Sequence, residues 1–243
     1  MNILILFGST SDAPVYEPIF ELCKQNHNAD FEVISAHRNP DRLEARLAEK
    51  NFDAVIAGAG ISAHLPGVVA SKVKGPVFGV PVGAQFGGLD AVMSIQMMPY
   101  GVPVLMCGPD RAAQFLPFME ATFALRESWN KEIGVIVPDS VAGQAHTEKE
   151  LTRLKALAEA EGVELKFSSD IPDNMPRIRF ISEAGQATDH PLEIAVPLLA
   201  PAERKSPQMA VDCFEWTTEA GLWVCVNNSR NALLFFRKAI TGA

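Results

Sequence analysis

The stretch ILILFGSTSD, residues 3–12, indicates how this chain folds. Five apolar residues lead into small and hydroxyl-bearing ones, and the next residues, APVYEPIFELCKQ (13–25), continue as an amphipathic segment. A buried strand that ends in a short turn and leads into a helix is the unit of a parallel sheet covered by helices. The chain is therefore expected to begin with a βα unit.

This unit repeats through the first half of the chain. We expect strands at residues 3–7, 31–34, 54–57, 76–80 and 102–106, and helices at about 12–25, 40–50, 65–71, 88–98 and 110–129. Five strands in this alternation predict an α/β fold, a flavodoxin-like, doubly wound parallel sheet with three α/β/α layers.

Beyond residue 129 the pattern begins again, with strands expected at 133–137 and 163–167 around a helix at 147–161. Three later stretches align in order with the first half: IGVIVPDS (133–140) with ILILFGSTSD, LEIAVPLLAP (192–201) with PVFGVPVGAQ (76–85), and GLWVCVNNSRNALLFF (221–236) with GVPVLMCGPDRAAQFL (101–116). We therefore expect a tandem duplication, with residues 1–128 as the catalytic half and 129–243 as a diverged, non-catalytic second α/β copy. An unrelated α/β appendage is the alternative.

The composition narrows the functional class. A hydrophobic content of 48% with 21% charged residues is typical of a soluble globular protein. The 21 basic and 29 acidic side chains give a net charge of −8, which argues against a general nucleic-acid-binding surface. No run approaches the roughly 20 apolar residues of a membrane span. We expect a cytoplasmic protein with no nucleic-acid or membrane partner, whose four widely spaced cysteines are reduced packing residues.

Small and polar residues gather where the first strands end. GSTSD (8–12) follows the first strand, SAHRNP (35–40) the second, GAGISAHLPG (58–67) the third, and VPVGAQFGG (80–88) ends the fourth. Because the carboxyl ends of parallel strands share one edge, where helix N-termini favour anions, we expect a single pocket there. Arg38 and backbone amides suit a phosphate, and His37 suits proton transfer near neutral pH. Each motif alone has a plainer reading, namely a helix N-cap at Ser11 or Asp12 and a surface loop around His37.

The order and near spacing of GSTSD, SAHRNPD, AGAGISAHLPGVVA, GVPV, GLDAVMSI and MPYGVPV resemble class I N5-carboxyaminoimidazole ribonucleotide mutases, also called aminoimidazole ribonucleotide carboxylases. The resemblance covers about half of the chain. It implies carboxyl transfer on an aminoimidazole ribonucleotide in de novo purine biosynthesis, by a mutase (isomerase) or a direct carboxylase (lyase). It also implies a small-molecule nucleotide substrate, no metal, no cofactor, and a homo-oligomer with sites at subunit contacts.

The resemblance also implies roles for individual residues. His37 would be the general acid/base at the imidazole carbon that receives the carboxyl group, and His64 would line the carboxylate or carbon dioxide pocket together with its loop, which includes Gly60, Ser62, Ala63 and Leu65. The ribose phosphate and ribose would be held by Ser9, Asp12 and Arg38, with Ser11 and Ser35 close by.

The chain also departs from the family pattern. The loop after VPV (80–82), which contains Gln85, is one residue short, and SIQMMP (94–99) stands where the family reads SIVQMP, so Gln96 is one place out of register. The second half offers FSSDIP (167–172) in place of SAHR, so we expect it to have lost its own site and to stand in for a neighbouring subunit. Its residues to watch are His190 and Asn231.

Two other functions remain open. One is a related carboxylase for a different nucleotide, and the other is a nucleotide-binding regulatory or assembly protein with the same fold. The presence of both His37 and His64 counts against the second.

Overall fold

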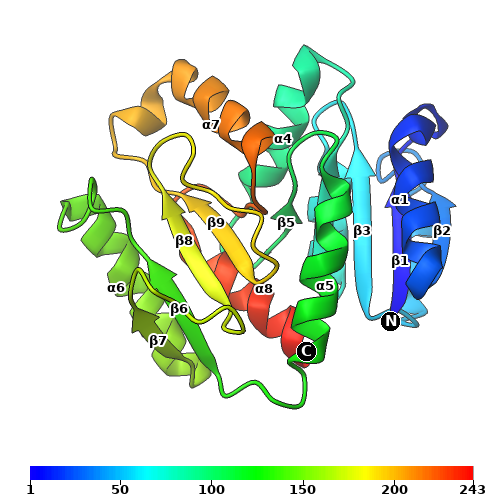
Figure 1. Ribbon diagram of the computed structural model, residues 1–243. Coiled ribbons are helices and arrows are strands. Elements are labelled where there is room, and N and C mark those ends of the chain that lie inside the picture. The colour runs from blue at the N-terminus through cyan, green and yellow to red at the C-terminus, as the bar shows by residue number, and fades with distance from the viewer. Residues whose placement is uncertain (243) are drawn as a thin grey trace.

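The computed structural model describes residues 1–242 and contains two parallel sheets (Figure 1). The first has the strand order β2-β1-β3-β4-β5 and the second β7-β6-β8-β9. The strands are β1 (Asn2–Phe7), β2 (Asn28–Val33), β3 (Ala54–Ala59), β4 (Val77–Pro81), β5 (Leu105–Met106), β6 (Glu132–Ile136), β7 (Glu164–Phe167), β8 (Arg177–Ile181) and β9 (Glu193–Pro197). The order of the first sheet is the flavodoxin-like order, so the predicted fold class is confirmed.

Helices cover both faces of the first sheet, and α6 and α8 cover one face of the second (Figure 1). They are α1 (Ala13–Asn26), α2 (Pro40–Ala48), α3 (His64–Lys72), α4 (Leu89–Gln96), α5 (Phe115–Ala124), α6 (Ala145–Glu161), α7 (Pro207–Glu219) and α8 (Ser229–Thr241), with 3-10 turns η1 (Thr10–Asp12), η2 (Phe86–Gly88), η3 (Ala112–Gln114) and η4 (Glu203–Lys205). Ile3 and Ile5 pack in the core with α1, α5, α6 and α8, whereas Leu4 and Leu6 pack with α2, α3, α4 and α7. A strand buried on both faces needs a continuous apolar run, which residues 3–7 provide.

The two sheets meet through a short segment around Trp223. The backbone N–H of Trp223 donates to the carbonyl oxygen of Met106 in β5 at 2.7 Å, and the N–H of Met106 donates to the carbonyl oxygen of Trp223 at 2.8 Å. The two segments are antiparallel. On its other side the segment pairs in parallel with Ala195 of β9. The strands of the two halves therefore run in opposite directions across this seam, and the carboxyl edge of one sheet continues the amino edge of the other.

The strand order of the second sheet repeats the first four positions of the first, as a tandem duplication would produce. Within residues 1–242, however, no helix connects β7 to β8 or β8 to β9, so the counterparts of α2 and α3 are absent. Where those helices would pack, β8 carries charged side chains, and Arg179 Nε donates to Glu193 Oε1 at 2.9 Å. The division at residues 128 and 129 stays a prediction, because aromatic side chains of both halves share one core, with the Phe78 and Phe235 ring centroids 5.2 Å apart.

Several expected elements differ from those observed. The strand expected at 31–34 begins three residues earlier, at Asn28 of β2, and β5 covers only Leu105–Met106 of the strand expected at 102–106. The helix expected at 110–129 is shorter, because Pro117 lacks an N–H and tolerates only about one turn of helix before it, so α5 begins at Phe115. The last aligned stretch is also three residues out of register. Met106 pairs with Gly79 of β4 and Trp223 with the corresponding Ala195, so Trp223 is the counterpart of Met106 and not of Pro103. No helix within residues 1–242 is both long and apolar enough to cross a membrane.

Candidate active site

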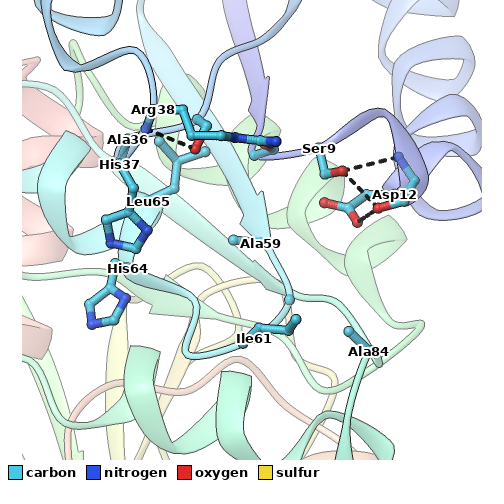
Figure 2. Close-up of a pocket in the computed structure, with 14 residues that line it drawn as sticks. Ser9, Asp12, Ala36, His37, Arg38, Ala59, Ile61, His64, Leu65 and Ala84 are labelled. Atoms are coloured by element: carbon cyan, nitrogen blue, oxygen red, sulfur yellow. Dashed lines mark hydrogen bonds between the residues drawn. The ribbon is translucent and has the colours of Figure 1, made fainter.

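A cavity of about 280 Å³ opens at the carboxyl ends of β1, β2 and β3 (Figure 2). Its lining comes from the three loops that follow these strands and from the loop after β4. The lining residues are Gly8, Ser9, Ser11, Asp12, Ser35, Ala36, His37, Arg38, Ala59, Gly60, Ile61, His64, Leu65 and Ala84. Loops that are far apart along the chain therefore form one pocket.

The two histidines lie together on one side of this pocket (Figure 2). His37 belongs to the loop between β2 and α2, and His64 is the first residue of α3. Their ring centroids are 5.0 Å apart, and the rings meet nearly edge to face, at 65°. Both side chains are exposed, so two proton carriers face the opening of the same cavity.

Arg38 extends across the pocket from the histidine side toward Ser9 (Figure 2). Its backbone N–H donates to Ser35 Oγ at 3.3 Å, which shapes the loop that carries it. Its guanidinium donates to the carbonyl oxygen of Gly8, also at 3.3 Å. This contact places a permanent cation beside the loop after β1, which suits a phosphate group.

The loop after β1 closes on itself through hydroxyl groups. Ser9 Oγ accepts hydrogen bonds from the backbone N–H of Ser11 at 3.2 Å and from Ser11 Oγ at 2.8 Å, so Ser9 caps η1. Asp12 precedes α1, but its side chain makes no capping bond to that helix. It is only 7% exposed, and burial raises the pKa of its carboxyl group despite the hydrogen bond from Ser11. A buried carboxylate at the edge of a pocket is stabilised by hydroxyl donors, which a ribose would offer.

The loop before His64 is held by α4. Ile61 and Ser62 have positive φ angles of 20° and 58°. The backbone N–H of Ser62 donates to Asp90 Oδ2 at 2.8 Å, and Ser94 Oγ donates to the carbonyl oxygen of Ser62 at 2.8 Å. These two bonds hold an uncommon backbone conformation at the residues leading into His64.

Most of the predicted site residues line the cavity, namely Ser9, Ser11, Asp12, Ser35, His37, Arg38, Gly60, His64 and Leu65. The other two do not. Ser62 is bonded through its backbone to α4, and Ala63 is fully buried. Sequence reasoning assigned no role to Asp90 and Ser94, although both lie in the GLDAVMSI motif. It placed the loops that contain Gly8, Ala36, Ala59, Ile61 and Ala84 at the pocket, but did not name these five as site residues.

The second half supplies none of the residues that line this cavity within the described part of the chain. Asn231 is fully buried, where it accepts a hydrogen bond from the backbone N–H of Gly101 at 3.0 Å and donates to the carbonyl oxygen of Pro99 at 2.9 Å. His190 lies elsewhere, and its Nδ1 accepts a bond from the backbone N–H of Leu192. Both residues therefore stabilise turns away from the pocket.

Comparison with known proteins places the similarity in the first half. A family model described as AIR carboxylase matches residues 2–123. An N5-carboxyaminoimidazole ribonucleotide mutase of Methanocaldococcus jannaschii is 45% identical over 111 residues, which are 45% of this chain and 70% of that protein. The mutase of Escherichia coli strain K12 is 46% identical over 110 residues, which are 42% of this chain and 64% of that protein. The crystal structure of Treponema denticola PurE matches with 23% identity and a TM-score of 0.45, covering 66% of this chain and 97% of its own. The sequence matches thus span about two thirds of the length of these relatives.

Proposed function

Since the chain belongs to the AIR (aminoimidazole ribonucleotide) carboxylase family, we propose that its first half transfers a carboxyl group on an aminoimidazole ribonucleotide. The relatives named above suggest conversion of N5-carboxyaminoimidazole ribonucleotide to its C4-carboxylated isomer. The observation that carries the proposal is the pair of histidine rings, 5.0 Å apart in one cavity that also contains Arg38 and Asp12.

The proposed reaction needs one proton donor and one proton acceptor, and a single histidine can serve as both. Breaking the carbamate C–N bond releases carbon dioxide and requires a proton on the nitrogen, and attack of ring carbon C4 on carbon dioxide then releases a proton from C4. One proton enters and one leaves, so a single imidazole that alternates between acid and base balances both steps. We assign this role to His37, and we assign His64 to the carbon dioxide or carboxylate pocket.

Binding is assigned to the opposite side of the cavity. Arg38 and the loop of Ser9 and Ser11 hold the phosphate, because guanidinium and backbone amides are suited to bidentate and multiple contacts with phosphate oxygens. Asp12 accepts hydrogen bonds from the ribose hydroxyls. The width of the cavity then separates the phosphate from the imidazole chemistry at His37.

We also propose that the chain works as a homo-oligomer. His37 and His64 are both exposed in the single chain. Proton transfer and capture of carbon dioxide both benefit from exclusion of water, which a neighbouring subunit over the opening would provide.

The test is an assay of the purified protein with N5-carboxyaminoimidazole ribonucleotide, run beside aminoimidazole ribonucleotide plus bicarbonate. We expect turnover of the first substrate, and expect His37→Asn to abolish turnover while leaving nucleotide binding largely intact, because a proton carrier lowers the barrier more than it adds affinity. His27→Asn, which alters a histidine paired with Glu120 at 3.1 Å outside the cavity, is the control and should retain activity. Nucleotide binding without turnover of either substrate would instead favour a regulatory protein.

A further inference from the structure

A second cavity, of about 250 Å³, lies between the two halves of the chain. Helices α4 and α7 pack side by side above the sheets in Figure 1, and the cavity lies between them and η4. Met93 and Gln96 line it from α4, Met97 lines it from just after that helix, and Met209 and Cys213 line it from α7. It shares no lining residue with the cavity of His37 and His64.

Gln96, one of the lining residues, has a side-chain amide without hydrogen-bond partners among residues 1–242. Its side chain is 1% exposed, and within residues 1–242 neither its Oε1 nor its Nε2 has a hydrogen-bond partner. Leaving a buried donor or acceptor unpartnered destabilises the folded protein. An amide with both groups free beside a cavity is therefore suited to a ligand that offers an acceptor and a donor next to each other.

The methionines among the other lining residues favour a planar aromatic ligand, and Glu203, Arg204 and Ser206 add polar groups on the side of η4. Thioether sulfur atoms contact aromatic rings favourably, and three methionines line this one cavity. Adenine combines a flat aromatic ring with an adjacent N–H donor and ring-nitrogen acceptor, and a glutamine amide pairs with this edge through two hydrogen bonds. Both amide atoms are covered in the structure, so a ligand reaches them only when a lining side chain moves, and Met97, which is 60% exposed and unbranched, is able to rotate.

We propose that this cavity binds an adenine-type base, which pairs with the Gln96 amide and packs against the methionines. The site is built from both halves, because one wall comes from α4 and the other from η4 and α7. The second half therefore contributes a ligand site separate from the chemistry at His37.

The same helix connects this cavity to the His64 loop. In α4, Asp90 and Ser94 bond to the backbone of Ser62, while Met93 and Gln96 line the second cavity. Because α4 is only eight residues long, a ligand that fixes one end restrains the other. Occupancy is thus expected to stabilise the loop that leads into His64, and any effect on turnover rests on the function proposed above.

The test uses adenosine as the probe, with the whole chain and isothermal titration calorimetry. We expect wild-type protein to bind adenosine, and expect N6,N6-dimethyladenosine, which lacks the N–H donor, to bind at least tenfold more weakly. Gln96→Met should lower adenosine affinity at least tenfold and should not lower the melting temperature, because it removes a buried unpartnered amide. Gln25→Met, in an exposed position on α1, is the matched control and should bind as wild type does.

Hydrogen exchange gives a readout that does not depend on turnover. Adenosine should slow amide exchange across residues 61–64 in wild type but not in Gln96→Met. Unaltered adenosine affinity in Gln96→Met would overturn the proposal, as would binding that is lost in Arg38→Ala but kept in Gln96→Met, which would place adenosine in the other cavity. Wild-type protein that does not bind adenosine would overturn it as well, whether or not the carboxyl-transfer assay succeeds.

Discussion

Replacing Asp90 by alanine should slow the proposed reaction, although Asp90 does not line the cavity of His37 and His64. Asp90 Oδ2 accepts the hydrogen bond from the Ser62 backbone N–H at 2.8 Å, and this bond holds two residues with positive φ ahead of His64. A hydrogen bond to a charged group contributes about 1.5–3 kcal/mol. If the bond sets the share of molecules with the loop in place, its loss reduces that share, and with it kcat/KM, by about 10- to 150-fold.

The assay is steady-state kinetics with N5-carboxyaminoimidazole ribonucleotide on a graded set of variants. Asp90→Asn retains an acceptor oxygen and should lose less activity than Asp90→Ala. Ser94→Ala removes only the neutral bond to the Ser62 carbonyl, so about 2- to 10-fold is expected, from roughly 0.5–1.5 kcal/mol. Activity of Asp90→Ala within twofold of wild type would show that the loop keeps its conformation without α4 and would refute this reasoning.

Three further predictions concern binding and stability. Arg38→Ala should weaken binding of the phosphorylated nucleotide by about 10- to 100-fold in calorimetry, because charge-assisted bonds to phosphate are lost, whereas Arg42→Ala, which breaks an exposed pair with Glu32, should bind normally. Glu150→Ala should lower the free energy of unfolding in urea by about 2–5 kcal/mol, because it leaves the buried backbone N–H and hydroxyl of Ser229 without their acceptor. The exposed Glu159→Ala should change the free energy of unfolding little. An equal loss in both variants would show that the bonds to Ser229 do not stabilise the fold. Because burial raises the pKa of Asp12 above 3.8, its ionised form destabilises the folded state above that raised pKa and the penalty disappears as pH falls through it. Asp12→Asn should therefore raise the melting temperature at pH 7 but not near pH 3, and a lower melting temperature at pH 7 would contradict this.

The parts of the site that could be predicted are those that follow a strand directly. A run such as residues 3–7 sets both the strand and the point where it ends, so the residues just after it must lie at the carboxyl edge of the sheet. Ser9, His37 and His64 were predictable for this reason, and His64 also because imidazole has an obvious chemical use. Ala59 and Ala84 line the same cavity, but small apolar side chains in a sequence do not distinguish a cavity wall from ordinary packing.

Contacts between distant segments were harder to predict. The bond from Ser62 to Asp90 joins residues 28 positions apart, and its geometry depends on how α4 packs on the sheet. The three-residue shift at Trp223 has a similar cause, because GLW (221–223) and GVP (101–103) align on a shared glycine, whereas the register is set by backbone pairing with Ala195. For a strand paired on both sides, backbone pairing therefore defines the register better than sequence similarity between diverged copies does.

The arrangement at this seam also explains why the second half does not complete the His37 cavity within one chain. The Trp223 segment is antiparallel to β5, so the carboxyl edge of the second sheet lies beside the amino edge of the first. Helix α4 leaves the carboxyl edge of its own sheet near Asp90 and ends at the opposite edge at Gln96, where the chain after β9 and α7 meet it. A second copy joined in this way contacts the far end of the helix that supports the His64 loop. Under the proposed function, closure of the His37 cavity would come from another subunit of the proposed homo-oligomer, whereas the covalent second half contacts α4, which bonds to the His64 loop.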